Sequence, residues 1–349
     1  MRYVSTALAA AVLAFLAAWL LIRERPDRRA SASATFEHRF PEQTTAYHQP
    51  SSVDARWHEN RGHAWSIKDR EETDPEGDPR WGRILAGRPK LRPQPAACLT
   101  CHAAAGTARA ASYYEARDRQ PLGCPDCHDR QGDLRSAVCE QCHREYYIAQ
   151  GQAAFPEGRT ADEIEAFYER RGIADWIHAG TGAVVLRAQH PQFEMCAQGP
   201  HARAGVACAD CHMPFERRGA TRITDHRAMP PLDNAGRACL PCHREPVAGL
   251  LARVKETEQR TQALLTRAED ALVAAIDAIE SAQAAGARPA AALKLQTKAQ
   301  WRIDFVAADR SLGFHAPQES ARLLAEAIDY ARQAQLAAGL KATRRSAIE

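Results

Sequence analysis

Ten of the eleven cysteines occur in five copies of one pattern, in which two residues separate a pair of cysteines and a histidine follows directly. Cysteine pairs with this spacing bind zinc in some proteins, but a histidine after every second cysteine favours a different chemistry. In the C-x-x-C-H pattern the two thiols form thioethers with the vinyl groups of a haem, and the histidine ligates the iron. We therefore predict five covalently attached c-type haems, at Cys98–His102, Cys124–His128, Cys139–His143, Cys208–His212 and Cys239–His243.

The supply of further histidines decides how many irons could be ligated on both sides. An iron that only transfers electrons usually takes two axial ligands from the protein. The chain contains 14 histidines, and five of them belong to the motifs. The nine others would suffice for all five haems, so the count leaves open whether one iron has a free coordination position; they are His38, His48, His58, His63, His178, His190, His201, His226 and His315.

Longer stretches around the motifs narrow the choice. The chain reads CEQCHREYY at the third motif, RAQHPQFEM after it, PHARAGVACADCHMP at the fourth, TDH before the fifth, and AQWRIDF followed by GFHAP near the end. In order and spacing, these stretches resemble the pentahaem cytochrome c nitrite reductases, the ammonia-forming family. The resemblance covers the chain from about His48 to the C-terminal helices.

The resemblance implies that the first haem is the catalytic one, attached to Cys98 and Cys101 and open on the side opposite His102. It also implies a second histidine for each of the other four irons, which would then only transfer electrons. These assignments are His226 for the haem on Cys124, Cys127 and His128; His63 for the haem on Cys139, Cys142 and His143; His315 for the haem on Cys208, Cys211 and His212; and His201 for the haem on Cys239, Cys242 and His243.

A catalytic pocket that contains Tyr146, His190 and an arginine is a further implication of the resemblance. For His190 the alternative is a surplus haem ligand or a structural histidine. The family carries its catalytic arginine in a Leu-Arg-Thr-Gly context, which this chain lacks. Arg83 lies at about the family's distance before Cys98, and Arg80 is the next candidate.

The resemblance also implies a calcium site beside this pocket. Its ligands would be the Glu145 carboxylate, the backbone carbonyls of Tyr146 and Arg187, and the Gln189 side chain. Carboxylate, carbonyl and amide oxygens suit a hard cation such as calcium. The alternative is an ion pair between Glu145 and Arg187 without any metal.

These features predict an oxidoreductase that reduces nitrite to ammonium with electrons from a quinol-linked cytochrome. Much of the family holds the catalytic haem with a lysine, and His102 in its place leaves an alternative open: a membrane-anchored electron-transfer cytochrome between the quinol pool and another reductase. An open haem could also act on hydroxylamine, nitric oxide or sulfite. The net charge of +3, with acidic and basic residues interspersed, does not indicate a nucleic-acid partner.

The N-terminal segment predicts the compartment. Residues 1–22 are interpreted as an uncleaved signal anchor, since 4–22 is an apolar run that would be about 28 Å long as a helix, enough to cross a hydrocarbon core. Cleavage near the small residues 30–34 is the alternative and would give a soluble periplasmic protein. Because haem is attached outside the bacterial cytoplasmic membrane, we expect the chain on the periplasmic side. Residues 23–39, polar and Pro- and Ser-containing, are predicted as a tether.

The rest of the chain divides by composition. Residues 40–245 are rich in His, Cys, Gly and Pro and lack sustained periodicity, which predicts a pentahaem domain whose core is haem rather than side chains. Cys196, outside the motifs, is expected to be buried, because an exposed free thiol is a liability in an oxidising compartment.

Residues 246–349 should form a C-terminal helical region that also supplies His315. Apolar residues at three-and-four spacing, such as Leu272, Ile276 and Ile279, predict long amphipathic helices, and a long apolar stripe also favours a homodimer. The expected fold is mainly α with little strand, a haem-filled core being followed by long C-terminal helices. The predicted helices run from about Pro246 to Ala285, from Pro289 to Gly313 and from about Pro317 to Gly339.

Overall fold

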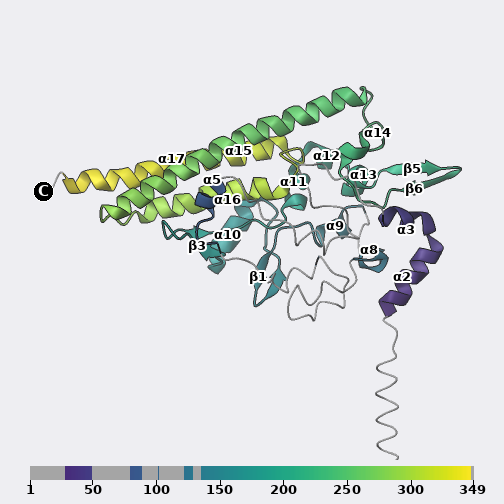
Figure 1. The fold of residues 1–349 in the computed structure, drawn as a ribbon, viewed down its shortest axis with the longest axis horizontal. Coiled ribbons are helices and arrows are strands. Elements are labelled where there is room, and N and C mark those ends of the chain that lie inside the picture. Colours follow the sequence, from purple (N-terminus) through teal and green to yellow (C-terminus); the bar gives the residue numbers. More distant parts are fainter. Residues whose placement is uncertain (1–27, 49–78, 89–100, 102–121, 129–134, 347–349) are drawn as a thin grey trace, which may run out of the picture.

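The computed structural model describes residues 28–48, 79–88, 101, 122–128 and 135–346. Within these ranges the chain is mainly helical, as predicted, and its few strands form three separate antiparallel hairpins, β1–β2, β3–β4 and β5–β6 (Figure 1). The strands are β1 (Tyr147–Ala149), β2 (Gln152–Ala154), β3 (Trp176–Ile177), β4 (Val184–Val185), β5 (Phe215–Arg218) and β6 (Thr221–Thr224). The helices are α2 (Arg28–Arg39), α3 (Pro41–Tyr47), α5 (Pro79–Ile84), α8 (Cys124–His128), α9 (Ala137–Glu140), α10 (Ala161–Arg171), α11 (Gln192–Gln198), α12 (Pro200–Arg203), α13 (Cys208–His212), η3 (Pro231–Asn234), α14 (Ala235–Ala238), α15 (Val247–Ala284), α16 (Ala290–Asp309) and α17 (Pro317–Ser346).

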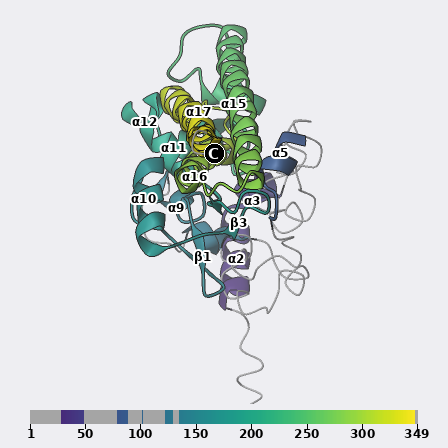
Figure 2. The ribbon, with the colours of Figure 1, turned by 90° about the vertical axis from the view of Figure 1, so that its left-hand side faces the viewer.

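The three C-terminal helices form one layer along the long axis of the molecule (Figure 1). α17 packs against both α15 and α16, and Figure 2 shows the three helices side by side. The predicted stripe on α15 is the buried one, with Leu272, Ile276 and Ile279 inaccessible to solvent, and Trp301 and Phe305 of α16 are equally buried. This layer therefore has a side-chain core of the ordinary kind. Each large apolar side chain buried in it stabilises the fold by about 1.5–3 kcal/mol.

Prolines and glycines limit these helices nearly where predicted. A proline precedes α15 and α16, and Gly286, with φ of 82°, follows the end of α15. The left-handed conformation of Arg310 ends α16 slightly before the predicted glycine. α17 differs from the prediction, since it continues through Gly339 to Ser346. A single glycine inside a helix costs only about 1 kcal/mol relative to alanine, which is too little to end a packed helix.

The rest of the described chain consists of short elements. α8, α9, α12, α13 and α14 each have only four or five residues. Helices of this length are not stable by their own hydrogen bonds, so other groups must hold them in place. α16 connects this part to the helical layer, because it contacts β4, α10 and α11 as well as α15 and α17.

The structure describes part of the predicted tether but not the predicted anchor. The described part of the predicted tether, residues 28–39, is the helix α2, which contains neither Gly nor Pro. Phe36 of α2 stacks on His128 of α8 with 5.4 Å between ring centroids. The predicted anchor, residues 1–22, lies outside the described residues. In the part of the chain that the structure describes, no helix combines the length and apolarity needed to cross a membrane.

Candidate functional site

The four C-x-x-C-H motifs that lie wholly within the described residues each form a helical turn. α8 and α13 coincide with the second and fourth motifs. In the third and fifth motifs, the backbone N–H of the histidine donates to the carbonyl of the first cysteine, at 2.8 Å for His143 and 2.9 Å for His243. Because residues three apart lie on one face of a helical turn, both thiols of a motif can reach one edge of a haem.

The first motif is only partly described. Cys101 is half-buried. Cys98, His102 and the predicted ligand His63 lie outside the described residues. The open position at the first haem, and the second ligand of the third haem, therefore stay predictions from the resemblance.

Three of the four predicted ligand pairs meet in space. The ring centroids of His128 and His226 lie 6.1 Å apart, those of His201 and His243 lie 6.2 Å apart, and those of His212 and His315 lie 6.4 Å apart. A metal between two imidazoles lies about 2 Å from each ligating nitrogen, and each nitrogen lies roughly 1.1 Å from its ring centroid, so about 6.2 Å is required. The spacing of all three pairs thus fits an iron between the rings.

Hydrogen bonds at the second ring nitrogen orient these ligands. Nδ1 of His212 and Nδ1 of His226 lie 3.0 Å and 2.8 Å from backbone carbonyl oxygens. Nδ1 of His315 lies 2.7 Å from Oδ1 of Asp309, whose side chain is fully buried. Donation from Nδ1 leaves Nε2 without a proton and available to a metal. Burial lowers the pKa of His212 to about 4, which favours the neutral ring that a metal requires.

The β5–β6 hairpin carries the segment that presents His226. Asp225, next to it, is almost completely buried and pairs with Arg227 at 2.6 Å and with Arg237 at 3.3 Å. Burial acts to raise the pKa of Asp225, but its hydrogen bonds with Arg227 and the charges of both arginines lower it overall. The ionised carboxylate therefore fixes the loop that bears the predicted ligand.

The third and fourth motifs are tied together directly. The N–H of Ala209 donates to the carbonyl of Arg135 at 2.9 Å, and the N–H of Cys208 donates to the hydroxyl of Ser136 at 3.1 Å. The guanidinium of Arg135 also pairs with the carboxylate of Asp210. These bonds join the residues just before α9 to α13, so they hold two haem-attachment turns in a fixed relation.

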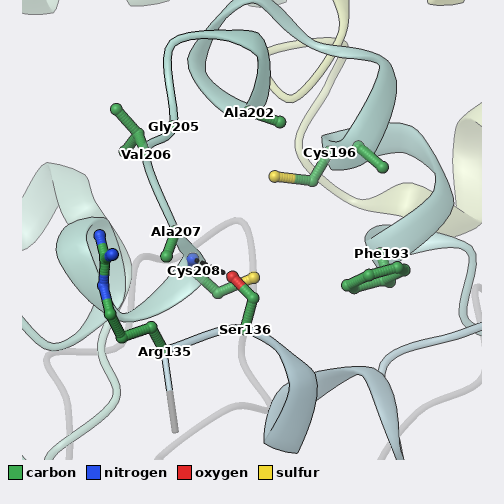
Figure 3. A pocket seen from close by; sticks show the side chains of 10 residues that line it. Arg135, Ser136, Phe193, Cys196, Ala202, Gly205, Val206, Ala207 and Cys208 are labelled. Carbon is green, nitrogen blue, oxygen red and sulfur yellow. Dashed lines mark hydrogen bonds between the residues drawn. The ribbon is translucent and has the colours of Figure 1, made fainter. Parts of the chain in front are cut away.

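A pocket of about 270 Å³ opens beside the fourth motif (Figure 3). Phe193, Cys196 and Cys208 are among the side chains that line it. Cys196, expected to be buried, is half-buried, and its side chain borders this pocket. Because Cys208 is a predicted haem-attachment residue, the pocket lies where we expect the space beside the fourth haem.

His178 is a satisfied structural histidine. Its Nδ1 accepts the backbone N–H groups of Gly180 and Thr181 at 3.2 Å and 3.1 Å, so the ring proton must be on Nε2. Nε2 in turn donates to the carbonyl oxygen of Arg83 at 2.8 Å. With both nitrogens occupied and the side chain buried, His178 leaves the pool of candidate iron ligands.

Tyr146 and His190, the predicted pocket residues, lie side by side. Their rings stack with 5.8 Å between centroids and 22° between planes, and Tyr146 is buried. The His190 ring also meets His143 edge-on, at 6.4 Å and 76°. Directly after this segment, the N–H of Phe193 donates to the carbonyl of His143 at 2.8 Å. The structure therefore places both pocket residues against the third haem motif.

Glu145 links this pocket to its surroundings. One oxygen of its fully buried carboxylate accepts the N–H groups of Gln189 at 2.7 Å and His190 at 3.2 Å, and the other accepts the hydroxyl of Tyr168 at 3.1 Å. The N–H of Glu145 donates to the carboxylate of Glu194 at 3.2 Å. Burial raises the pKa of Glu145 well above its ordinary value and raises that of Glu194 to about 7.

α10 positions Tyr168 by well-defined helix ends. Thr160 and Glu163 form a capping box at its N-terminus, in which the side chain of each residue accepts the backbone N–H of the other residue. Gly172, with φ of 65°, ends the helix in the left-handed conformation. Burial and the nearby Glu145 carboxylate raise the pKa of Tyr168, so its hydroxyl stays a donor.

The predicted calcium ligands are compatible with a hard cation. The Glu145 carboxylate accepts the backbone N–H groups of Gln189 and His190 and the hydroxyl of Tyr168, and Arg187 is not among these partners. Two neighbouring buried carboxylates, of Glu145 and Glu194, form an arrangement that a divalent cation would stabilise. The described residues contain no group of three or more His, Cys, Asp or Glu side chains able to hold a metal, so backbone and amide oxygens would have to complete the site.

The two candidate arginines contact α15. The Arg83 guanidinium pairs with Asp277 and, at 2.9 Å, with Glu280, and these two hydrogen-bonding carboxylates raise its pKa. Arg80 lies 3.4 Å from carboxylate oxygens of Glu269 and of the next residue. Neither Tyr146 nor His190 is among the hydrogen-bond or ion-pair partners of Arg83, so the structure joins only two of the three predicted pocket residues.

Four residues around the pocket escaped the sequence analysis: Tyr168, Glu194, Gln300 and Asp304. Gln300 and Asp304 lie within AQWRIDF, which carried the resemblance but received no role. Their spacing of four residues on a buried helix face was the available signal. Glu194 lies within RAQHPQFEM, which also carried the resemblance, but a glutamate is normally exposed, so its burial was not indicated; Tyr168 had no signal in the sequence.

Comparison with known proteins decides the family. Residues 130–348 match the sequence model of the family described as Cytochrome c552. This chain belongs to the cytochrome c552 family. It is therefore a c-type cytochrome with covalently attached haem, as the motifs predict. The cytochrome c-552 of Parabacteroides distasonis is 34% identical over 329 residues, which cover 79% of this chain and 64% of the relative. That of Bacteroides fragilis strain YCH46 is 36% identical over 297 residues, which cover 71% and 60%. The chain thus spans less than two thirds of the length of these relatives.

A solved structure has the same fold. It is the catalytic subunit of the cytochrome c nitrite reductase from Desulfovibrio desulfuricans, described with two calcium sites. The TM-score is 0.73, and the match covers 88% of this chain and 85% of that one at 22% sequence identity. The likeness confirms the predicted architecture of a mainly helical multihaem cytochrome.

Proposed function

We propose that this cytochrome c552 family member reduces nitrite to ammonium in the periplasm. The observation that carries the proposal is the stacked pair of Tyr146 and His190, held against the third haem motif on a fold shared with a nitrite reductase. The haem on Cys98 and Cys101, with His102 as its ligand, would supply the iron that receives the substrate, and the other haems would supply electrons.

The reaction consumes eight protons and six electrons for each nitrite, so proton donors must stand at the substrate throughout. An imidazole such as that of His190 can give and regain a proton near neutral pH. The hydroxyl of Tyr146 can donate a second hydrogen bond to a nitrite oxygen. Glu145 accepts the backbone N–H of His190, and the ring of Tyr146 stacks on the imidazole. The imidazole therefore keeps its orientation between successive proton transfers.

A catalytic arginine remains part of the proposal, with Arg83 as the candidate and Arg80 as the second choice. Its cation would attract the nitrite anion and polarise an N–O bond. For this role Arg83 would have to exchange Asp277 and Glu280 for the substrate. If it does, Arg83→Lys should raise KM for nitrite at least several-fold; an unchanged KM would assign Arg83 to the α5–α15 contact alone.

We further propose a calcium ion bound by the Glu145 carboxylate, the carbonyls of Tyr146 and Arg187, and the Gln189 side chain. The raised pKa of the buried Glu145 carboxyl supports a cation there, because a nearby positive charge would stabilise its ionised form. Removal of calcium with a chelator should lower nitrite turnover, and added calcium should restore it. Metal analysis that finds no calcium in active protein would contradict this site.

We also propose the organisation of the chain that its apolar N-terminal run, its composition and its helical periodicity predict. Residues 1–22 would anchor it, residues 23–39 would link the anchor to the pentahaem domain at 40–245, and residues 246–349 would form the helical region and the homodimer contact. A quinol-linked cytochrome would supply the electrons. N-terminal sequencing of the mature protein tests the anchor, and a monomeric sedimentation profile in detergent would argue against the dimer.

The direct test uses the purified haem-loaded protein. With reduced viologen as the electron donor, it should consume nitrite, and ammonium should appear in equal amount. The His190→Ala variant should lose most of this turnover while haem content, measured as the pyridine haemochrome, stays unchanged. Full turnover in that variant would remove His190 from the mechanism, and the absence of turnover in the wild type would overturn the proposed function.

One observation favours a second candidate, an electron-transfer cytochrome in which every iron has two protein ligands. The centroid separation of His143 and His190, 6.4 Å, equals that of His212 and His315. His190 could thus ligate the third haem, which would free His63 for the first. Electron paramagnetic resonance of the oxidised protein separates the two candidates: a high-spin ferric signal perturbed by nitrite supports the enzyme, and exclusively low-spin haem supports electron transfer.

A further inference from the structure

Side chains bind all five backbone N–H groups of the segment Leu186–His190. It continues β4 beyond the point where pairing with β3 ends. Five consecutive N–H groups each donate to a side-chain oxygen, and four different side chains supply these oxygens. The pairs are Leu186 with Gln300 at 3.3 Å, Arg187 with Asp175 at 2.7 Å, Ala188 with Asp304 at 2.7 Å, Gln189 with Glu145 at 2.7 Å and His190 with Glu145 at 3.2 Å.

The first three acceptors alternate between α16 and Asp175, as the N–H groups of an extended chain do, and Glu145 accepts both of the last two N–H groups. Gln300 and Asp304 take the first and third N–H groups, and both come from α16. Four residues of a helix rise about 6 Å, and two residues of a strand rise about 6.6 Å, so one helix face matches alternate N–H groups of the segment. The Thr297 hydroxyl extends the match, since it donates to the carbonyl of Val184 at 2.7 Å.

This arrangement limits where the histidine can lie. A shift of residues 186–188 by one position would exchange the two faces of that extended stretch and carry His190 away from its place beside Tyr146. The α16 contacts oppose such a shift at two N–H groups. The same segment carries Arg187 and Gln189 of the proposed calcium site, so its register governs both features.

Stability alone does not explain Asp304. Its carboxylate is buried, with 9% of the residue exposed, and the structure gives it one hydrogen bond, from Ala188. Burial raises the pKa of Asp304 to about 6, so the position weakens the preference of this carboxylate for its ionised form, although it stays mostly ionised at neutral pH. A buried charge of this kind is often replaceable by an apolar residue without loss of stability. Its role should therefore be sought in what its hydrogen bond holds.

We propose that Asp304, together with Gln300, is a positioning residue for His190: through Ala188 and Leu186 it sets the register of the segment that presents the imidazole to Tyr146. The inference rests on the proposed function for its catalytic consequence. The contact itself stands independently of it, since it concerns the backbone of residues 186–190.

The experiment compares Asp304→Ala with Asp304→Asn in the haem-loaded protein. Asparagine keeps an oxygen that accepts the Ala188 N–H, whereas alanine removes it. Glu326→Gln serves as the control, because Glu326 contacts Arg302 on the same helix α16 but none of the five N–H groups. Haem content is measured for each variant, and Gln300→Met provides a second test should Asp304→Ala not accumulate.

Two readouts separate the contact from its catalytic effect. Hydrogen exchange, followed by mass spectrometry of a peptide that spans residues 184–192, should accelerate about 10- to 100-fold in Asp304→Ala, the range for losing one hydrogen bond to a charged group. kcat for nitrite should fall about 10-fold or more with little change in KM, and Asp304→Asn should restore both readouts to within about threefold, one uncharged hydrogen bond being retained.

Each outcome decides part of the inference. Unchanged exchange in Asp304→Ala and in Gln300→Met would overturn it. Accelerated exchange with unchanged kcat in an active enzyme would overturn the link to His190. A wild type without nitrite turnover would refute the proposed function instead, while the exchange measurement would still decide whether Asp304 holds the segment.

Discussion

The haem-motif region and the C-terminal helices of this molecule are held together by different means. α15, α16 and α17 bury large side chains such as Leu272, Trp301 and Phe305 completely. In the haem-motif region the described motifs lie on or beside helices of four or five residues, and three pairs of histidines lie 6.1–6.4 Å apart. The side-chain core reaches from the helical layer into α10 and α11, whereas the turns that carry the motifs are arranged around paired histidines. We therefore expect the helical layer to depend on haem less than the motif turns do.

The largest expected effect is the loss of fold without haem. A chain produced in the cytoplasm, where haem is not attached, should keep the helices of residues 246–346 but lose ordered structure around the haem motifs, because helices of four or five residues are not stable without the cofactors they hold. Limited proteolysis followed by mass spectrometry measures this. Cleavage should be confined to residues before about 246; protection of residues 135–245 in the haem-free chain would erase the distinction.

The next effect concerns what His190 does in the haem-motif region. If His190 is the proton donor, His190→Ala should lower nitrite turnover by at least 100-fold, in the range for general acid–base groups of about 10²–10⁴. The low-spin haem signals should stay as they are in the wild type. Electron paramagnetic resonance checks this, since a new high-spin signal in the variant would identify His190 as an iron ligand.

The helical layer should respond to a core mutation like an ordinary globular protein. Trp301 is fully buried and donates its indole N–H to the carbonyl of Ala161 at 3.0 Å. Trp301→Ala should lower the free energy of unfolding by about 3–5 kcal/mol. Denaturant unfolding followed by circular dichroism measures it, with Leu336→Ala, at a position 67% exposed, as the control within about 0.5 kcal/mol.

The smallest expected effect tunes a single cofactor. Asp309 accepts a hydrogen bond from Nδ1 of His315, which makes the imidazole a stronger electron donor and stabilises oxidised iron. Asp309→Asn should raise the reduction potential of one haem by roughly 60 mV, the equivalent of a tenfold change for one electron. A spectropotentiometric titration measures it. Asp329→Asn removes the same charge from an exposed position and should leave all potentials within about 10 mV, since salt screens exposed charges.

The sequence predicted the helical layer well because its signals are local. Proline before α15 and α16 and a three-and-four apolar stripe mark features that lie within a few residues of one another. The pairing of His226 with His128, or His315 with His212, links residues about a hundred apart, and only the resemblance to a known family suggested it. The separation of the ring centroids in both pairs fits an iron between the two imidazoles.

The parts that could not be predicted depend on contacts without a sequence pattern. Arg83 was placed by its distance before Cys98, but its partners on α15 are acidic residues of an ordinary exposed helix face. The side chains that bind the N–H groups of Leu186–His190 come from three separate segments, so no single stretch of sequence indicates them. The contacts of Gln300 and Asp304 depend on how α16 packs against this segment. The helical periodicity of the sequence predicts that α16 exists, but it does not predict which residues its polar side chains contact.

The bonds of Arg135 and Ser136 to the fourth motif have a consequence for electron flow. The Arg135 carbonyl binds the main-chain N–H of Ala209, and the Ser136 hydroxyl binds that of Cys208, next to the predicted attachment turns of two haems. Loops elsewhere can move or change in length without altering the gap that an electron must cross between these two carriers. The rate of that transfer should therefore be the part of the pathway least sensitive to temperature and to mutations at the surface.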